Sequence, residues 1–317
     1  MLAVVLALAA AVGYGSSDFA AGLASRSAPV IQITLLASAV SVVIVAAALP
    51  FAASPGPSTA ALAWGFGAGL GGTMGAFSLY LGFRHAAFSV AAPLSAVASA
   101  GFSVLAGLLY GERPTTLALT GIVLALPAIV GVSASAAAEA EAPPSEAPPS
   151  EAPPSEALPS EALPSGAIAG GRPAAGGRPA AGVVYGLVAG AFFALLFIGL
   201  DRAGSGSGLW PVAAAAVGEL AAALVAAVAV RSFRLCGGRA RLLAVITGVA
   251  GAVGTILFFL ATHQGFLAVT AVLTSLYPAV TIVLARVVLG ERLTALRLAG
   301  LGLAGVCVSL IAVGGAS

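Results

Sequence analysis

From Tyr80 to Ala125 the chain reads YLGFRHAAFSVAAPLSAVASAGFSVLAGLLYGERPTTLALTGIVLA, and from Phe259 to Ala304 it reads FLATHQGFLAVTAVLTSLYPAVTIVLARVVLGERLTALRLAGLGLA. The two stretches align without a gap at an offset of 179 residues, which the Gly-Glu-Arg triplets at Gly111 and Gly290 fix. Duplication of so long a segment predicts a chain built from two equivalent halves.

Composition places both halves in a membrane. Hydrophobic residues make up 60% of the chain and charged residues 8%, whereas soluble proteins carry about 25% charged residues. The excess apolar surface must face lipid, so we expect a multi-pass protein. All thirteen basic residues are arginine, a bias typical of GC-rich bacterial genomes, which indicates a bacterial cell membrane. The sequence has no basic cluster suited to nucleic acid.

Apolar runs of the length that spans a bilayer, about 20 residues, occur ten times. Backbone groups cannot stay unpaired in hydrocarbon, so the runs predict helices and an all-α integral membrane fold. The chain begins with such a run and no basic segment precedes it, which favours a retained helix over a cleaved signal peptide. The predicted helices are 2–24, 30–52, 60–83, 88–110, 114–134, 181–203, 208–230, 241–263, 265–289 and 293–315.

The helices fall into two domains separated by a different kind of sequence. Residues 1–134 form the first five-helix repeat and residues 181–317 the second. Residues 135–180 between them are rich in Pro, Ser, Glu and Gly and hold six of the eleven acids. Such a segment cannot build a core, and we predict a disordered linker that acts as a spacer.

An odd number of helices per repeat has a topological consequence. After five spans, the second repeat must enter the membrane from the opposite face, so the two repeats are inverted about an axis in the membrane plane. This arrangement is typical of secondary transporters that work by alternating access.

The ordered motifs resemble those of the drug/metabolite transporter superfamily, in particular its ten-helix EamA-type permeases. The resemblance implies a membrane permease, usually an exporter of amino acids, other metabolites or toxic compounds, with both termini in the cytoplasm. The linker departs from the compact pattern of that family. The motifs are Gly13-Tyr14-Gly15-Ser16-Ser17-Asp18-Phe19, Ala92-Pro93-Leu94, Gly111-Glu112-Arg113, Ser275-Leu276-Tyr277-Pro278-Ala279 and Gly290-Glu291-Arg292.

Two acids inside apolar helices are the main candidates for binding a substrate or a proton. Glu219 lies near the centre of the seventh helix, where a charge costs roughly 2.5–3.5 kcal/mol on insertion scales. Asp18 follows Tyr14 by one turn on the first helix, and the glycines and serines before it predict loosely wound backbone suited to a cation or an ammonium group. The alternatives are hydrogen bonding to a neighbouring helix for Glu219 and local backbone capping for Asp18.

Further candidates line the predicted helices. Tyr80, Phe259 and Tyr277 are possible walls of the binding cavity, although lipid- or core-facing aromatics are commoner. Pro93 and Pro278 are candidate hinge or cavity-lining residues, with a static kink as the alternative. For both triplets we predict a structural role, in which the glycine ends a helix and Glu112 or Glu291 lies at the start of the next one, followed by Arg113 or Arg292.

The sequence contains no catalytic constellation, metal-ligand spacing or phosphate-binding loop, so we expect neither an enzyme nor a cofactor. The hypothesis favoured here is an exporter of a small metabolite, amino acid or drug, driven by proton exchange. One alternative is an uncoupled or import permease of the same fold. Another is a membrane scaffold that works through its linker. The distribution of arginines opposes the family's orientation and favours termini outside the cell.

Overall fold

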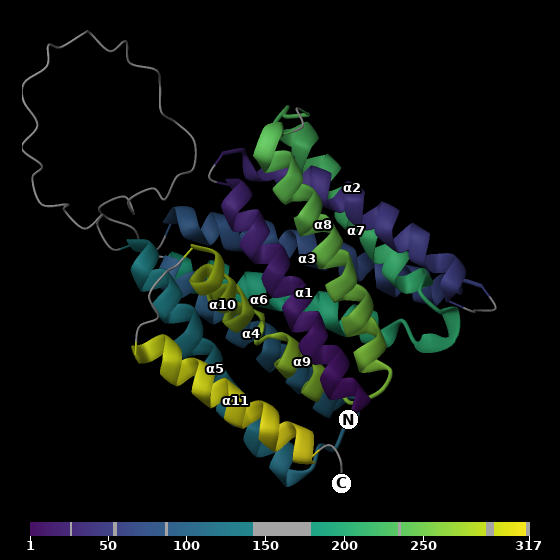
Figure 1. Cartoon of the computed structure of the whole chain (residues 1–317). Helices are drawn as coiled ribbons and strands as arrows, with labels where there is room; N and C mark the ends of the chain where they lie inside the picture. Colours follow the sequence, from purple (N-terminus) through teal and green to yellow (C-terminus); the bar gives the residue numbers. More distant parts are fainter. Residues whose placement is uncertain are drawn as a thin grey trace, which may run out of the picture.

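The computed structural model describes residues 1–25, 27–52, 56–85, 88–141, 179–233, 236–289 and 295–314. Within these ranges all regular structure is helical, which confirms the all-α part of the predicted fold class (Figure 1). The helices are α1 (Leu2–Ser25), α2 (Val30–Ala48), η1 (Leu49–Phe51), α3 (Thr59–His85), α4 (Phe88–Leu109), α5 (Thr116–Glu141), α6 (Pro179–Arg202), η2 (Ser205–Ser207), α7 (Trp210–Ala229), α8 (Gly238–Thr262), α9 (Leu267–Thr274), α10 (Tyr277–Leu289) and α11 (Ala295–Gly314).

Six helical segments among the described residues are long and apolar enough to cross a membrane. They are Leu2–Ser25, Val30–Phe51, Val184–Arg202, Trp210–Ala229, Gly238–Thr262 and Leu267–Val288. Large apolar side chains such as Phe51, Leu109 and Val287 point outward with exposed fractions of 90%, 77% and 75%. This outward apolar surface suits lipid, and it indicates a multi-pass membrane protein.

The predicted helix over 265–289 is wrong as a continuous element. It ends at Thr274 and restarts at Tyr277, which separates α9 from α10. Pro278 cannot donate a backbone hydrogen bond, and its ring would clash with the carbonyl of Thr274, four residues earlier. Pro278 therefore lies in the first turn of α10, where proline is tolerated, rather than inside a kinked helix.

The border of the linker also differs from the prediction. Helix α5 ends at Glu141 rather than at residue 134, and α6 begins at Pro179. Alanine and glutamate dominate the end of α5 (SASAAAEAE) and both have high helix propensity, so they extend the helix past its apolar part. Most of the predicted linker lies outside the described residues.

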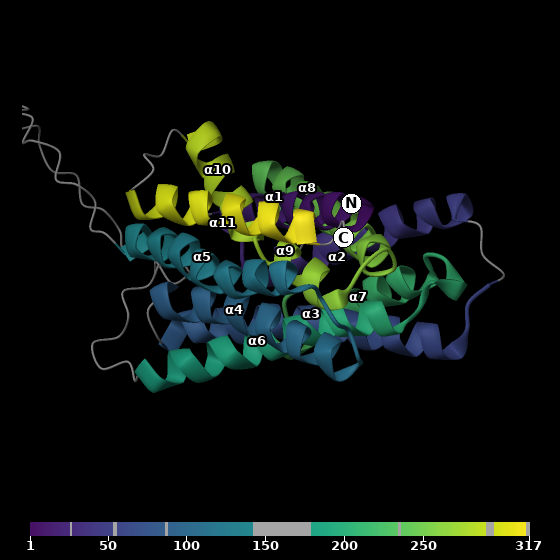
Figure 2. The ribbon, with the colours of Figure 1, turned by 90° about the horizontal axis from the view of Figure 1, so that it is seen from below.

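The pairs of helices that pack together in one half have counterparts in the other. Equivalent helices are α1 and α6, α2 and α7, α3 and α8, α4 and the pair α9 and α10, and α5 and α11. The packing of α1 on α8 has its counterpart in α3 on α6, and α2 on α8 has its counterpart in α3 on α7. Helices α5 and α11 lie side by side on one flank in both views (Figures 1 and 2).

Glycines make this close packing possible. A Cβ atom on Gly69 would collide with the backbone of Ala215, and one on Gly248 would collide with the backbone of Ala37. Gly248 follows Gly69 by the 179-residue offset of the repeat. Small residues let helix backbones approach in a membrane, where the hydrophobic effect does not drive helices together.

Candidate functional site

Tyr14 lies where α1, α6 and α8 meet. Its hydroxyl donates a hydrogen bond of 3.1 Å to Oγ1 of Thr255 on α8, and the Thr255 hydroxyl donates to the carbonyl of Gly251 at 3.0 Å. The Tyr14 ring lies 6.4 Å, centroid to centroid, from the ring of Phe197 on α6. Phe197 in turn packs against Phe258 at 4.5 Å. One polar hydroxyl pair is thus framed by aromatic rings from three helices.

Two carboxyl groups approach the same tyrosine. Asp18, one turn along α1, and Glu219 on α7 both lie near enough to Tyr14 to interact with it electrostatically. The Glu219 carboxyl lies over Gly72 of α3, with Oε1 3.8 Å from the position a Cβ would take. The Glu219 carboxyl thus lies at van der Waals distance from α3. The structure brings together Tyr14, Asp18 and Glu219, which the sequence singled out separately.

The two carboxyls and the described arginines differ in their place along the helices. Every arginine of the described helices lies in a terminal turn, and the other described arginines lie in loops. Asp18 and Glu219 instead lie within their helices, away from the terminal turns. The side chain of Asp18 is exposed and that of Glu219 is half-buried.

The glycines and serines before Asp18 allow α1 to pack closely against α8. Helix α1 is continuous from Leu2 to Ser25, so the predicted unwound backbone near Asp18 is absent. Ser17 instead donates a 3.0 Å hydrogen bond to the carbonyl of Thr247, and a Cβ on Gly13 would lie 2.8 Å from the Cα of Gly254. Helix α8 occupies the space that a looser α1 would have opened.

The predicted aromatic and proline residues have separate locations. Tyr277 begins α10 beside α1, where Thr281 donates a 3.0 Å hydrogen bond to the carbonyl of Gly15. Phe259 is 2% exposed, and its ring packs on His263 at 4.4 Å rather than on Tyr14. Tyr80 and Pro93 belong to α3 and α4, and their side chains lie outside what the structure describes.

The first Gly-Glu-Arg triplet ends α4. Gly111 has φ +90°, and the Glu112 N–H to Gly107 carbonyl and Gly111 N–H to Leu108 carbonyl bonds form a Schellman motif. Glu112 does not cap the next helix, α5, as predicted. Its carboxylate accepts hydrogen bonds from Leu267 and Ala268 at the start of α9. Arg113 is exposed, and Gly290, Glu291 and Arg292 lie outside the described residues.

The partners of Tyr14 and Ser17 on α8 were missed from the sequence. Thr247, Gly251 and Thr255 recur every four residues, and this stripe faces α1. Polar and small residues at helical spacing within an apolar helix were a usable signal. Phe197 carried no comparable signal, because it is one of several phenylalanines in α6.

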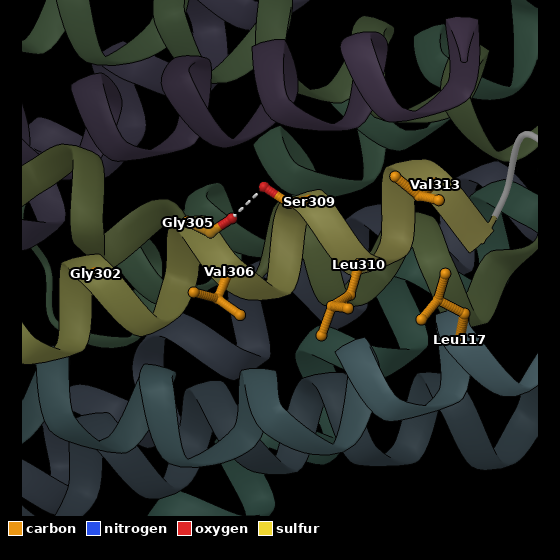
Figure 3. A pocket seen from close by; sticks show the side chains of 7 residues that line it. All are labelled: Leu117, Gly302, Gly305, Val306, Ser309, Leu310 and Val313. Carbon is orange, nitrogen blue, oxygen red and sulfur yellow. Dashed lines mark hydrogen bonds between the residues drawn. The ribbon is translucent and has the colours of Figure 1, made fainter.

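A shallow groove of about 580 Å³ lies elsewhere, along the outer face of α11 (Figure 3). The Ser309 hydroxyl in it donates to the carbonyl of Gly305 in its own helix at 2.9 Å. None of the lining residues that the structure describes is charged, so the groove offers no group that could bind a proton or a cation. The lining residues are Leu117, Gly302, Gly305, Val306, Ser309, Leu310 and Val313.

The model of the EamA-like transporter family matches residues 1–134. The first 134 residues of this chain are therefore similar to an EamA-like transporter unit. The match supports the resemblance inferred from the motifs, and the proteins of that family are membrane transporters. The cluster around Tyr14 joins α1 of this EamA-like unit to α6, α7 and α8 of the second half.

Comparison with other proteins adds the fold. A crystal structure of a protein 14% identical in sequence superposes on this chain with a TM-score of 0.71, over 99% of this chain and 97% of its own length. At that identity the similarity concerns the fold alone. No curated protein matched the sequence.

Proposed function

We propose that the protein is a permease that exports a small metabolite carrying an ammonium group, by alternating access and in exchange for protons. The observation that carries the proposal is the approach of Asp18 and Glu219, from different halves of the chain, to Tyr14. Amino acids, amines and cationic drugs all present such a group.

The charges of the site favour a positive group on the substrate. Two carboxyl groups attract an ammonium group and repel a second anion. The rings of Tyr14, Phe197 and Phe258 add apolar and cation-attracting faces. An aromatic or alkyl ammonium compound would satisfy both features.

The same carboxyls supply a route for coupling. An empty site in a low-dielectric membrane favours protonated carboxyls, and an arriving ammonium group favours the ionised form. Substrate and proton would then compete for Asp18 and Glu219. Export of the substrate in exchange for entering protons is driven by the proton gradient when protons are more abundant outside the cell.

Alternating access requires two conformations of similar energy. The correspondence of packing pairs between the halves supports inverted repeats, because one arrangement can then be adopted by either half. We propose that the two halves exchange roles when the site turns from one side of the membrane to the other.

The test is the composition of the medium around cells that overexpress the protein. Mass spectrometry should detect a compound with an ammonium group enriched by the wild type. Glu219→Gln and Asp18→Asn should each reduce that enrichment about tenfold or more, since they remove a charged partner. Asp201→Asn, at the end of α6, is the matched control and should retain export.

Two outcomes would contradict the proposal. Equal enrichment by the wild type and by both site variants would leave an exporter but remove the carboxyls from its mechanism. The other outcome is that the wild type, confirmed in the membrane, enriches no compound in the medium and takes up amines from it. The direction of transport would then be import rather than export.

A further inference from the structure

A loop of the first half reaches across to the second half through one side chain. Glu112, between α4 and α5, accepts a hydrogen bond from the Leu267 N–H to Oε1 at 2.5 Å and from the Ala268 N–H to Oε2 at 2.9 Å. Both carboxylate oxygens are therefore used at the start of α9, which lies far away in sequence and in the other half.

The local backbone is shaped for this contact. The Schellman motif at Gly111 turns the chain so that Glu112 leaves α4 toward α9. A Cβ on Gly107 would collide with Oε2 of Glu112, so the glycine leaves the path open. Gly107 and Gly111 thus both allow the Glu112 carboxylate to lie at the start of α9.

Helix α9 lacks a cap of its own. Phe266, the N-cap residue, makes no side-chain capping bond, and Leu267 and Ala268 are both 0% exposed. Buried N–H groups without partners are costly, and the positive end of a helix favours an anion. Glu112 supplies from the other half what the second half does not provide.

Helix α9 links this contact to the candidate site. It is only eight residues long and ends at the break before α10, where Thr274 donates a 3.3 Å hydrogen bond to the carbonyl of Ala7 on α1. The loop that carries Glu112 is also held to α6, because the Arg202 guanidinium lies 4.5 Å above the ring of Tyr110. Moving α9 away from this loop would therefore also disturb α1, which carries Tyr14 and Asp18.

We propose that Glu112 is a latch between the two halves, closed in this conformation, whose release from α9 opens the site toward the end of the molecule where α1 begins. The proposal rests on the transport function proposed above. The break after Thr274 lets α9 swing without α10, so the opening motion needs to break only the two Glu112 bonds and the neighbouring contacts of α9.

The experiment measures the distance across the latch in the full-length protein, reconstituted in lipid and without substrate. Spin labels go on Leu109→Cys and Phe266→Cys, which are exposed positions on its two sides. The native Cys236 and Cys307 are buried, with exposed fractions of 4% and 0%, and should not compete for the label. Pulsed electron resonance then gives the distribution of distances between the labels.

We expect one short distance in the wild type. Glu112→Ala should raise the population of a second, longer distance about tenfold or more, because it removes two charge-assisted hydrogen bonds. Glu112→Gln keeps one acceptor oxygen and should give an intermediate population. The control is Thr115→Val in the same loop, which loses a 2.8 Å bond to the carbonyl of Gly314 but not the contact with α9, and should leave the distances unchanged.

An unchanged distribution in both Glu112 variants would overturn the latch. So would a loss of thermal stability in these variants without any longer distance, because Glu112 would then only cap α9. The distances are measured without substrate, so failure of the latch and failure of the export assay are read separately.

Discussion

Tyr14 joins the two halves of the chain through a hydrogen bond to Thr255, a ring contact with Phe197 and an electrostatic interaction with Glu219, and it also interacts with Asp18 of its own helix. The bond to Thr255 fixes the position of its hydroxyl, while Phe197 holds the ring. With the hydroxyl so fixed, the carboxyls of Asp18 and Glu219 meet an oriented dipole instead of a mobile one. In the permease proposed above, we expect Tyr14 to orient the charges of the site and to contact the substrate.

The first prediction concerns the Tyr14–Thr255 bond. Tyr14→Phe keeps the ring but loses the hydrogen bond, and should cost about 1 kcal/mol, seen as a lower melting temperature in detergent. In a Thr255→Val background the same change should cost clearly less, because the partner is already gone. Strictly additive losses in the double variant would show that the two hydroxyls are not coupled.

The charged members of the candidate site could be predicted from the sequence, whereas its neutral members Phe197 and Thr255 could not. Asp18 and Glu219 could be predicted because few acids occur in the apolar helices and each is costly there. Phe197 and Thr255 could not be ranked in the same way, because aromatic and hydroxyl side chains are common in such helices. Their role depends on which helices become neighbours, and no local pattern gives that.

At the scale of elements, glycine positions decide which helices approach closely. Gly13 of α1 lies against Gly254 of α8, whereas Gly22 has nothing within 4 Å of its would-be Cβ. Both glycines belong to the same helix and differ only in their surroundings. They therefore separate the effect of packing from the intrinsic helix propensity of glycine.

The second prediction compares these two positions. Gly13→Ala should destabilise the protein by about 1–3 kcal/mol, because the new methyl group pushes α1 from α8. Gly22→Ala should be neutral or stabilise by up to about 1 kcal/mol, since alanine favours helix. The melting temperatures of the two variants in detergent should move in opposite directions. A similar small rise in both would mean that α1 and α8 are not closely packed at Gly13.

The break between α9 and α10 shows that hydropathy alone does not locate an interruption inside an apolar helix. The apolar run continues without interruption from Leu267 to Leu289, so length and composition predicted one helix. Ser275 and Leu276 interrupt it ahead of Pro278, and the residues of α9 are all buried. In the first half α4 is continuous from Phe88 to Leu109. The two halves therefore share helix order but differ in this detail, which a repeat alignment alone does not reveal.

At the scale of the whole molecule, the charges distinguish the two ends of the bundle. The end where α1 begins also holds Glu112 and the α6–α7 loop, and α11 ends there (Figure 1). The opposite end carries Arg231, Arg239 and Arg241 around the α7–α8 loop. Arginine is retained on the cytoplasmic side of membrane proteins, so the α7–α8 loop should be cytoplasmic.

The third prediction tests this orientation with single cysteines. Ser205→Cys in η2 and Phe233→Cys after α7 are both exposed positions at opposite ends of the bundle. A maleimide that cannot cross membranes should label Ser205→Cys in intact cells and Phe233→Cys only after lysis, while the buried native cysteines stay unlabelled in both. The reverse pattern would place both termini in the cytoplasm, as the family resemblance implies. The Glu112 latch would then close the cytoplasmic side of the site, the side from which an exporter loads its substrate.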